Sequence, residues 1–181
     1  MIDANKIKNS LPIEGDAVIL REFNRSNITD NYLGWLNDPE VVRYSNQRFT
    51  LHTHKSSLDY FQSFLGTNNI YLAIYLKKED LYIGTMTIYI STVHETADIG
   101  LLIGDKTSWG KGIGQESWKL IVDWLIEVVG IRKVTGGALR SNAGMVQIMV
   151  NSGMKIDGVR EAQELLDGRA QDILFFTKFN K

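Results

Sequence analysis

The feature that most constrains this chain is a glycine-rich turn placed between a strand pattern and a helix pattern. Residues 97–103 are mostly apolar, as in a buried strand, and polar turn residues follow them. Gly110, Gly112 and Gly114 then alternate with other residues, and their missing Cβ atoms allow an anionic group to approach the backbone. Helical periodicity begins directly afterwards. The turn is therefore expected at a helix N-terminus, where free N–H groups favour a phosphate.

The helix after this turn is predicted from one apolar face, with Gly130 as its stop. That face consists of Trp118, Ile121, Val122, Leu125 and Ile126. The spacing within the turn excludes two common nucleotide loops. A Walker A loop needs a Lys-Ser/Thr pair after its last glycine, but Gln115 and Glu116 follow Gly114. The alternating glycines also differ from the G-x-G-x-x-G pattern of dinucleotide-binding folds.

The stretch from Trp109 to Gly114 resembles the acetyl-CoA signature of the GNAT superfamily of N-acetyltransferases, in which Q/R-x-x-G-x-G/A lies between a strand and a long helix. The resemblance implies that this turn binds the pyrophosphate of acetyl-CoA through Trp109, Gly110, Lys111, Gly112, Ile113 and Gly114. It also implies that the preceding strand pairs with the pantetheine arm through Leu101, Leu102 and Ile103, and that backbone N–H groups near Leu102 and Ile103 polarise the thioester carbonyl. The chain departs from the pattern at Trp109, which replaces Gln or Arg, although these contacts are mostly made by the backbone.

A second segment of the same family follows, in which an Asn opens a helix that closes with Gly-Phe. Asn142 and Gly153 have this spacing here. Many members carry a tyrosine seven residues after the Asn, which protonates the departing thiolate, but this chain has Met149, whose thioether cannot deliver a proton. Ser141 and Asn142 are therefore the candidates for assisting catalysis, and Asn142 also for holding the cofactor or a water, unless they only cap the helix. A third alternative is that the CoA thiolate leaves without a dedicated acid.

Acetyl transfer to an amine requires the free-base form of that amine, because an ammonium ion has no lone pair. Asp98 is the candidate base, since it lies in the strand just before the pantetheine-binding stretch. Glu95, three residues earlier, is the second candidate. The alternative is that Asp98 is only solvated at the edge of a sheet.

The segment Tyr32–Val41 is similar to a W-x-N-D-P-x-V segment found in two GNAT branches. One branch acetylates the N-termini of ribosomal proteins, and the other acetylates amino sugars of bacterial surface polysaccharides. In both, the helices after the first strand form a wall of the acceptor site. Alternatively, the segment contains only core residues and a helix that stops at Asn37 and restarts at Pro39.

The loop at residues 44–49 is the candidate acceptor-binding loop. Arg48 is expected to pair with a nucleotide diphosphate, and Tyr44 to stack on a base or sugar, with a solvated loop as the alternative. A basic ribosomal protein would favour an acidic cleft, whereas this loop is basic. The predicted acceptor is therefore a nucleotide-linked amino sugar. A protein N-terminus is the alternative acceptor, and a non-catalytic acyl-CoA-binding domain is a further alternative function.

Composition excludes several other classes. The 181 residues include 20 Lys plus Arg and 21 Asp plus Glu, so charge gives no argument for binding nucleic acid or an anionic membrane. The absence of cysteine excludes disulfides and thiolate chemistry and fits a cytoplasmic protein. No apolar run is long enough to span a bilayer, and the spacing of His52, His54 and His94 matches no metal site. We therefore predict no metal, and the sequence leaves a homodimer open.

The order of the expected elements predicts one α/β domain over residues 1–181, with residues 1–16 as a peripheral segment. Strands are expected at residues 17–23, 70–77, 81–91, 95–103, 131–139, 154–166 and 170–178, and helices at 29–36, 39–44, 54–65, 113–130 and 142–152. Meandering strands followed by a crossover helix give a mixed, mostly antiparallel sheet with helices on both faces. This order resembles the GNAT fold.

Overall fold

The computed structural model describes residue 7 and residues 9–180. Its strands form one mixed sheet in the order β1-β2-β3-β4-β5-β6-β8-β7, in which only the neighbours β5 and β6 are parallel. Along the chain the strands are β1 (Ile13–Glu14), β2 (Val18–Glu22), β3 (Ile70–Leu76), β4 (Leu81–Ser91), β5 (Thr96–Ile103), β6 (Lys133–Leu139), β7 (Lys155–Leu166) and β8 (Arg169–Phe179). The mixed, mostly antiparallel sheet predicted from the sequence is confirmed.

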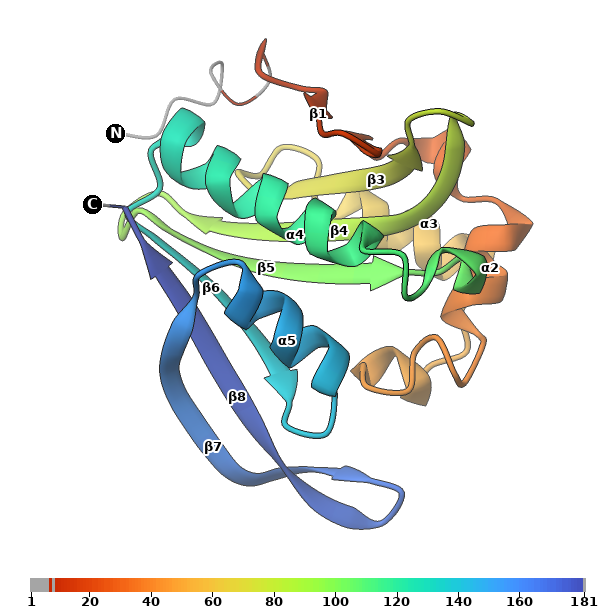
Figure 1. The fold of residues 1–181 in the computed structure, drawn as a ribbon. Coiled ribbons are helices and arrows are strands. Elements are labelled where there is room, and N and C mark those ends of the chain that lie inside the picture. Colours follow the sequence, from red (N-terminus) through yellow and green to blue (C-terminus); the bar gives the residue numbers. More distant parts are fainter. Residues whose placement is uncertain (1–6, 8, 181) are drawn as a thin grey trace.

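Helices cover both faces of this sheet (Figure 1). They are α2 (Asp30–Leu36), α3 (His54–Gln62), α4 (Ile113–Asp123) and α5 (Ala143–Asn151). One face carries α4 and α5, and the opposite face carries α2 and α3. The hairpin of β7 and β8 extends beyond the helices at one end of the molecule.

The alternation of side chains along β3 divides the core into two parts. Leu72 and Ile74 point toward the aliphatic core under α4, where Trp118 is 1% exposed. Tyr71 and Ala73 point to the other face, into an aromatic cluster with residues of α2 and α3. Each face of the sheet thus has its own chemistry, apolar on one side and rich in tyrosine on the other.

Glycines set both ends of the long helical stretch. Gly112 is the N-cap of α4 at φ 79°, and Gly130 closes the stretch at φ 85°, both in the left-handed region that favours glycine. The face predicted from periodicity is buried, and the last part, Trp124–Val129, continues as a π-helix. The strand, turn and helix expected from the sequence therefore form as predicted.

β5 and β6 pair along only part of their length. Their register joins Thr96 to Lys133, Ala97 to Val134 and Asp98 to Thr135, although β5 continues to Ile103 and β6 to Leu139. β4 pairs with one edge of β5 along its whole length. The other edge, which faces β6, has no strand partner beyond Asp98 among the described residues. We call this divergence the fork, and it opens toward the glycine turn.

Two local expectations differ from the structure. The helix predicted over residues 39–44 is a series of turns: Asp38 caps the start as expected and the Val42 N–H donates to the Asp38 carbonyl, but the next backbone bond, Ser45 N–H to the Val42 carbonyl, spans only three residues. Within the segment predicted to be peripheral, β1 adds to the sheet beside β2, and Ile7 and Ile13 are buried in the core. Residues 1–6 and 8 lie outside the described residues.

Candidate active site

The last paired residues of the fork carry the candidate base. Asp98 pairs with Thr135 in the sheet, and the Thr135 hydroxyl donates to Asp98 Oδ2 over 2.7 Å. The residue is still exposed at the fork, yet the surrounding protein raises the pKa of its carboxyl by desolvation, while the Thr135 hydrogen bond opposes this shift. A carboxylate with a raised pKa accepts a proton more readily, as general-base chemistry near neutral pH requires.

A cavity of about 320 Å³ fills the fork on the face of α2 and α3, and we call it the fork cavity. Asp98 and Gly100 line it from β5, and Thr87 and Tyr89 line it from β4. Cross-strand pairing sets Gly100 beside Thr87 and Asp98 beside Tyr89. The carboxylate therefore faces a space large enough for part of a small molecule.

The glycine turn lies at the open end of the fork, between β5 and α4. Gly110 and Gly112 have φ values of 71° and 79°, and no side chain caps the first turn of α4. The first N–H groups of this helix therefore stay available to an anion, as the sequence predicts. Lys111 is exposed between the two glycines. The expected binding of a pyrophosphate at this turn stays a prediction.

Three polar side chains hold the turn and α4 in place. Gln115 Nε2 donates to Ser152 Oγ beyond α5 over 2.9 Å, and Glu116 Oε1 accepts the Ala17 N–H over 2.8 Å. Trp109, which replaces the usual Gln or Arg, donates its indole N–H to the carbonyl of Ile103 over 2.9 Å. The indole thus binds the last carbonyl of β5, which fixes the strand end next to the turn.

The second motif forms the start of α5. Asn142 is the N-cap, and its Oδ1 accepts the Met145 N–H over 3.2 Å. Ser141 is exposed immediately before it. Met149, at the position of the usual tyrosine, is fully buried. The capping role anticipated for Asn142 is therefore present, and a catalytic role for Ser141 or Asn142 stays a prediction.

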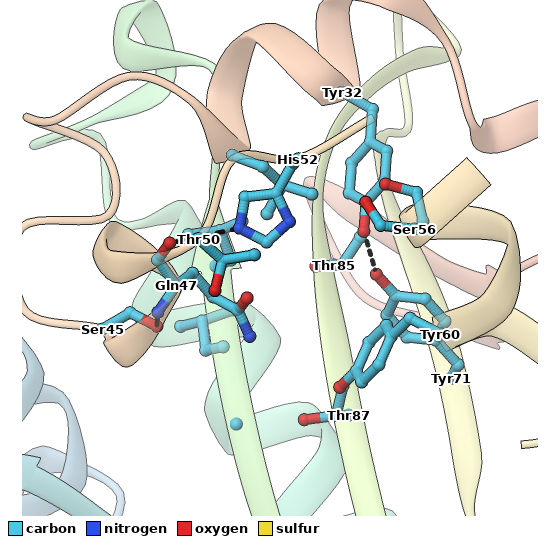
Figure 2. A pocket seen from close by; sticks show the side chains of 15 residues that line it. Tyr32, Ser45, Gln47, Thr50, His52, Ser56, Tyr60, Tyr71, Thr85 and Thr87 are labelled. Carbon is cyan, nitrogen blue, oxygen red and sulfur yellow. Dashed lines mark hydrogen bonds between the residues drawn. The ribbon is translucent and has the colours of Figure 1, made fainter. Parts of the chain in front are cut away.

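A second cavity of about 350 Å³ lies deeper between the sheet, α2, α3 and the loop at residues 45–52, and we call it the inner cavity. Most of its lining residues carry a hydroxyl group: Tyr32, Ser45, Thr50, Ser56, Ser57, Tyr60, Tyr71, Thr85 and Thr87. Figure 2 shows the loop side chains on one side and those of α2, α3, β3 and β4 on the other. Among the described residues, no Asp, Glu, Lys or Arg lines it, and His52 is the one histidine in its lining. Thr87 and Gly100 border both cavities, so the two meet there.

The tyrosines of the inner cavity are neutral hydrogen-bonding groups. The hydroxyls of Tyr32 and Tyr71 are bonded to each other at 2.7 Å (Figure 2). The hydroxyl of Tyr60 is bonded to that of Tyr89 at 2.8 Å. Burial is the main cause that raises the pKa of Tyr32, Tyr60 and Tyr71 above the ordinary tyrosine value. These side chains therefore offer uncharged hydroxyls to whatever occupies the cavity.

The Asn-Asp-Pro segment holds one wall of this cavity. Asn37 exchanges two hydrogen bonds with the backbone of His52, both 2.9 Å, and thereby fixes the loop at residues 45–52. Lys106 bonds Asp38 at 2.8 Å and Glu40 at 3.0 Å, which ties the same segment to the turn before α4. The segment thus connects the loop at residues 45–52 to the turn before α4.

Arg48 and Tyr44 lie near the cavities in different ways. Tyr44 lines the fork cavity and is 37% exposed. Arg48 donates to the carbonyls of Ser45 and Leu165 and lies 3.7 Å from the Glu164 carboxylate. The guanidinium therefore fastens the loop to the β7–β8 hairpin. Its expected pairing with a diphosphate stays a prediction.

The histidines lie apart from one another. His52 contacts the carbonyl of Gln47 at 3.2 Å, and His54 pairs with Asp30 at 3.0 Å. No group of three or more potential metal ligands occurs in the part of the chain that the structure describes. No helix there is long and apolar enough to cross a membrane.

The sequence-based search missed the hydroxyl lining of the inner cavity. Its signal is the period-two alternation in two strands, Tyr71, Ala73 and Tyr75 in β3 and Thr85 and Thr87 in β4, among apolar neighbours. Such an alternation predicts that this face of the sheet carries hydroxyl groups among its apolar side chains. Ser57, which joins the cavity from α3, left no comparable signal.

A divided sheet with a glycine turn at a helix N-terminus is typical of acetyl-CoA-dependent N-acetyltransferases, and this protein is such an enzyme. The chain belongs to the GNAT acetyltransferase family, because the family model described as "Acetyltransferase (GNAT) domain" matches residues 17–155.

Comparisons with known proteins agree with this assignment. A probable N-acetyltransferase of Bacillus subtilis, YjcK, is 24% identical over 127 residues, covering 68% of this chain and 70% of that protein. The fold is similar to that of spermidine N-acetyltransferase from Vibrio cholerae in complex with CoA and spermine, with a TM-score of 0.81, 15% identity, and coverage of 92% and 97% of the two chains. The fold is also similar to that of RimL, a ribosomal L7/L12 alpha-N-protein acetyltransferase, in complex with coenzyme A. The TM-score is 0.80 and the identity 14%, and the match covers 93% of this chain and 97% of that one. CoA is thus a ligand of these structural neighbours.

Proposed function

We propose that this acetyltransferase transfers the acetyl group of acetyl-CoA to the primary amine of an amino sugar, most favourably a nucleotide-linked one. The observation that carries the proposal is the pair of adjacent cavities: Asp98 lines the fork cavity, which shares Thr87 and Gly100 with the hydroxyl-lined inner cavity. The proposal has three parts: the base, the cofactor contacts and the acceptor.

Asp98 is the proposed general base. It takes the amine proton, directly or through a water, while the nitrogen forms a bond to the acetyl carbon and the C–S bond breaks. Its raised pKa and its position between Tyr89 and Thr135 support this role. Backbone N–H groups at Leu102 and Ile103 are proposed to stabilise the oxyanion of the tetrahedral intermediate.

The turn from Trp109 to Gly114 is proposed to bind the pyrophosphate, and Leu101 to Ile103 the pantetheine arm. The free N–H groups at the start of α4 and the unpaired edge of β5 support these contacts. Asn142 is proposed to use its side-chain amide toward the cofactor or a water, since its Oδ1 already caps α5. Ser141 is the candidate to protonate the departing thiolate, and it is exposed beside this helix start.

The sugar acceptor is favoured by the chemistry of the inner cavity. A polyamine carries several positive charges, and a buried charge needs a partner of opposite sign. No carboxylate lines the inner cavity among the described residues, whereas hydroxyl groups are abundant; the carboxylates of Asp98 and Glu164 line the fork cavity instead, and Glu164 lies 3.7 Å from the Arg48 guanidinium. Tyr44 and Tyr89 in the fork cavity supply aromatic surface for a base or sugar.

Release of CoA, followed by thiol titration, tests the proposal. The panel contains nucleotide-linked amino sugars, free amino sugars, spermidine and N-terminal peptides, each with acetyl-CoA. We expect turnover with an amino sugar at a kcat/KM well above that for spermidine. Turnover with peptides alone would move the assignment to protein N-terminal acetylation. CoA binding without turnover of any amine would indicate a non-catalytic acyl-CoA-binding domain.

A further inference from the structure

We infer that the inner cavity is the subsite for the hydroxylated ring of the acceptor, and that Ser57 Oγ is the group that binds one of its hydroxyls. This inference rests on the proposed function and gives it a specificity-determining residue. It depends on an unsatisfied buried hydroxyl, on the absence of charge around it, and on the place where the two cavities meet.

Ser57 is an unusual helix residue. It is 3% exposed, lies within α3 and lines the inner cavity, yet its Oγ has no hydrogen-bond partner. A serine within a helix commonly bonds the carbonyl four residues earlier, which here belongs to the cap residue Thr53, but this bond is not formed. A buried hydroxyl without a partner costs about 1–3 kcal/mol, so a ligand that supplies the partner gains affinity.

The surroundings of Ser57 select the kind of ligand. The other buried hydroxyls of the cavity, such as the Tyr32 and Tyr71 pair, are bonded to each other and neutral. In such a pair one hydroxyl donates and the other keeps its proton free for a further acceptor. A lining that both donates and accepts without charge matches a polyol, whose hydroxyls do the same, and does not match an ammonium chain.

The junction of the cavities sets the orientation of this ligand. Thr87 and Gly100 border both cavities, and Asp98 lies two residues before Gly100 on the same face of β5. A ring in the inner cavity therefore extends its amine through this junction toward the carboxylate. A nucleotide attached to the ring would leave through the fork cavity, which is lined by Tyr44 and Phe175 and opens at the surface.

Ser57→Ala tests the inference with glucosamine and with the nucleotide-linked amino sugar that turns over best. We expect the KM for either acceptor to rise about fivefold or more, the loss of about one hydrogen bond. The KM for acetyl-CoA should stay within twofold. The thermal stability of the variant should be unchanged or higher, because no internal hydrogen bond is removed. A serine with a purely structural role would instead lower stability and leave KM unchanged.

Ser63→Ala is the matched control. Ser63 is the C-cap of α3, where its hydroxyl donates to the carbonyl of Tyr60 over 2.6 Å, and it does not line the inner cavity. The Ser63→Ala variant should leave the KM values for the acceptor and for acetyl-CoA unchanged. Amino-sugar turnover that Ser57→Ala does not alter would overturn the inference while leaving the proposed function standing.

If no amino sugar is acetylated, the proposed function is refuted. A binding measurement still tests the inference in that case. Calorimetric titration with N-acetylglucosamine, a neutral sugar without a free amine, reports on the inner cavity alone. Binding that Ser57→Ala weakens severalfold supports the subsite. No binding, or equal binding by the wild-type protein and the variant, overturns it.

Discussion

The region proposed to bind the cofactor and the region proposed to bind the acceptor are built from different parts of the chain. We call them the cofactor side and the acceptor side. On the proposed cofactor side, the available groups are those of the backbone of β5, Gly110, Gly112 and the start of α4, where no side chain caps the helix. On the acceptor side, side chains from α2, α3, β3, β4 and a loop converge on the inner cavity. A site made of backbone tolerates side-chain changes, as Trp109 illustrates. A site made of side chains changes its specificity with each substitution.

The sharpest separation of the two sides is expected from Asp98→Asn. Loss of the base should lower kcat/KM for the amine about 100-fold or more, because general-base catalysis contributes that much. The affinity for acetyl-CoA should not change. In the wild-type protein, kcat/KM should rise with pH as Asp98, whose pKa is raised, loses its proton. Steady-state kinetics across pH should show that the variant lacks this rise.

Asp157→Asn is the control for that variant. Asp157 is a carboxylate of the same sheet that bonds Lys133 at 2.7 Å, and it does not line the fork cavity. Its replacement should leave the pH profile intact. Wild-type activity and an unchanged pH profile in Asp98→Asn would remove the carboxylate from the mechanism.

The cofactor side is tested by Gly112→Val, whose expected effect is next in size. A β-branched residue at φ 79° costs about 1–2 kcal/mol, so the turn should shift. We expect the KM for acetyl-CoA to rise about tenfold, since 1.4 kcal/mol corresponds to that factor. The KM for the acceptor should change little. Initial rates at varied acetyl-CoA measure the effect.

Gly130→Val is the control for Gly112→Val, because it introduces a similar backbone strain. Gly130 has φ 85°, and an added Cβ meets nothing within 4 Å there or at Gly112. This variant should lose similar stability and keep its KM for acetyl-CoA. If both variants raise that KM equally, the effect comes from general destabilisation and the assignment of the turn to pyrophosphate binding is wrong.

Gly100→Ala tests the junction of the two cavities. An added Cβ would lie 2.8 Å from Thr87 Oγ1, so the junction should narrow. We expect the acceptor KM to rise about fivefold, roughly 1 kcal/mol, and the acetyl-CoA KM to rise less. The double variant Gly100→Ala with Thr87→Ala, which removes that contact, should recover acceptor binding relative to Gly100→Ala alone. Equal effects on both substrates would show that the junction does not belong to the acceptor side.

The smallest expected effect is on stability. The pKa of Asp98 is raised in the folded state. Between the pKa of the unfolded chain and that of the folded state, the folded protein therefore binds more protons than the unfolded chain. Stability contributed by this residue therefore falls with rising pH. Asp98→Asn should melt at a higher temperature than the wild-type protein at pH 8, and the difference should shrink near pH 4. A lower melting temperature at pH 8 would contradict the desolvation of the carboxylate.

How far the sequence predicted the site follows the same division. The glycine turn, its helix and the boundaries of most strands could be predicted because each depends on a few adjacent residues. Asp98 was selected from its place in the strand, although its bond to Thr135 was not foreseen. Arg48 was expected to be free for a ligand, but the structure gives its guanidinium partners at Glu164 and Leu165. Those partners lie more than 100 residues away in the chain.

The sequence by itself therefore determined the strand, turn and helix of the cofactor side, since glycine conformations and helical periodicity are local properties. Only the tertiary structure decided where β5 parts from β6, because that depends on pairing between distant strands. It also decided that Ser57, Tyr71 and Thr85 share one uncharged cavity. Such a cavity is made by long-range packing, in which each residue receives its role from neighbours that the sequence places far away.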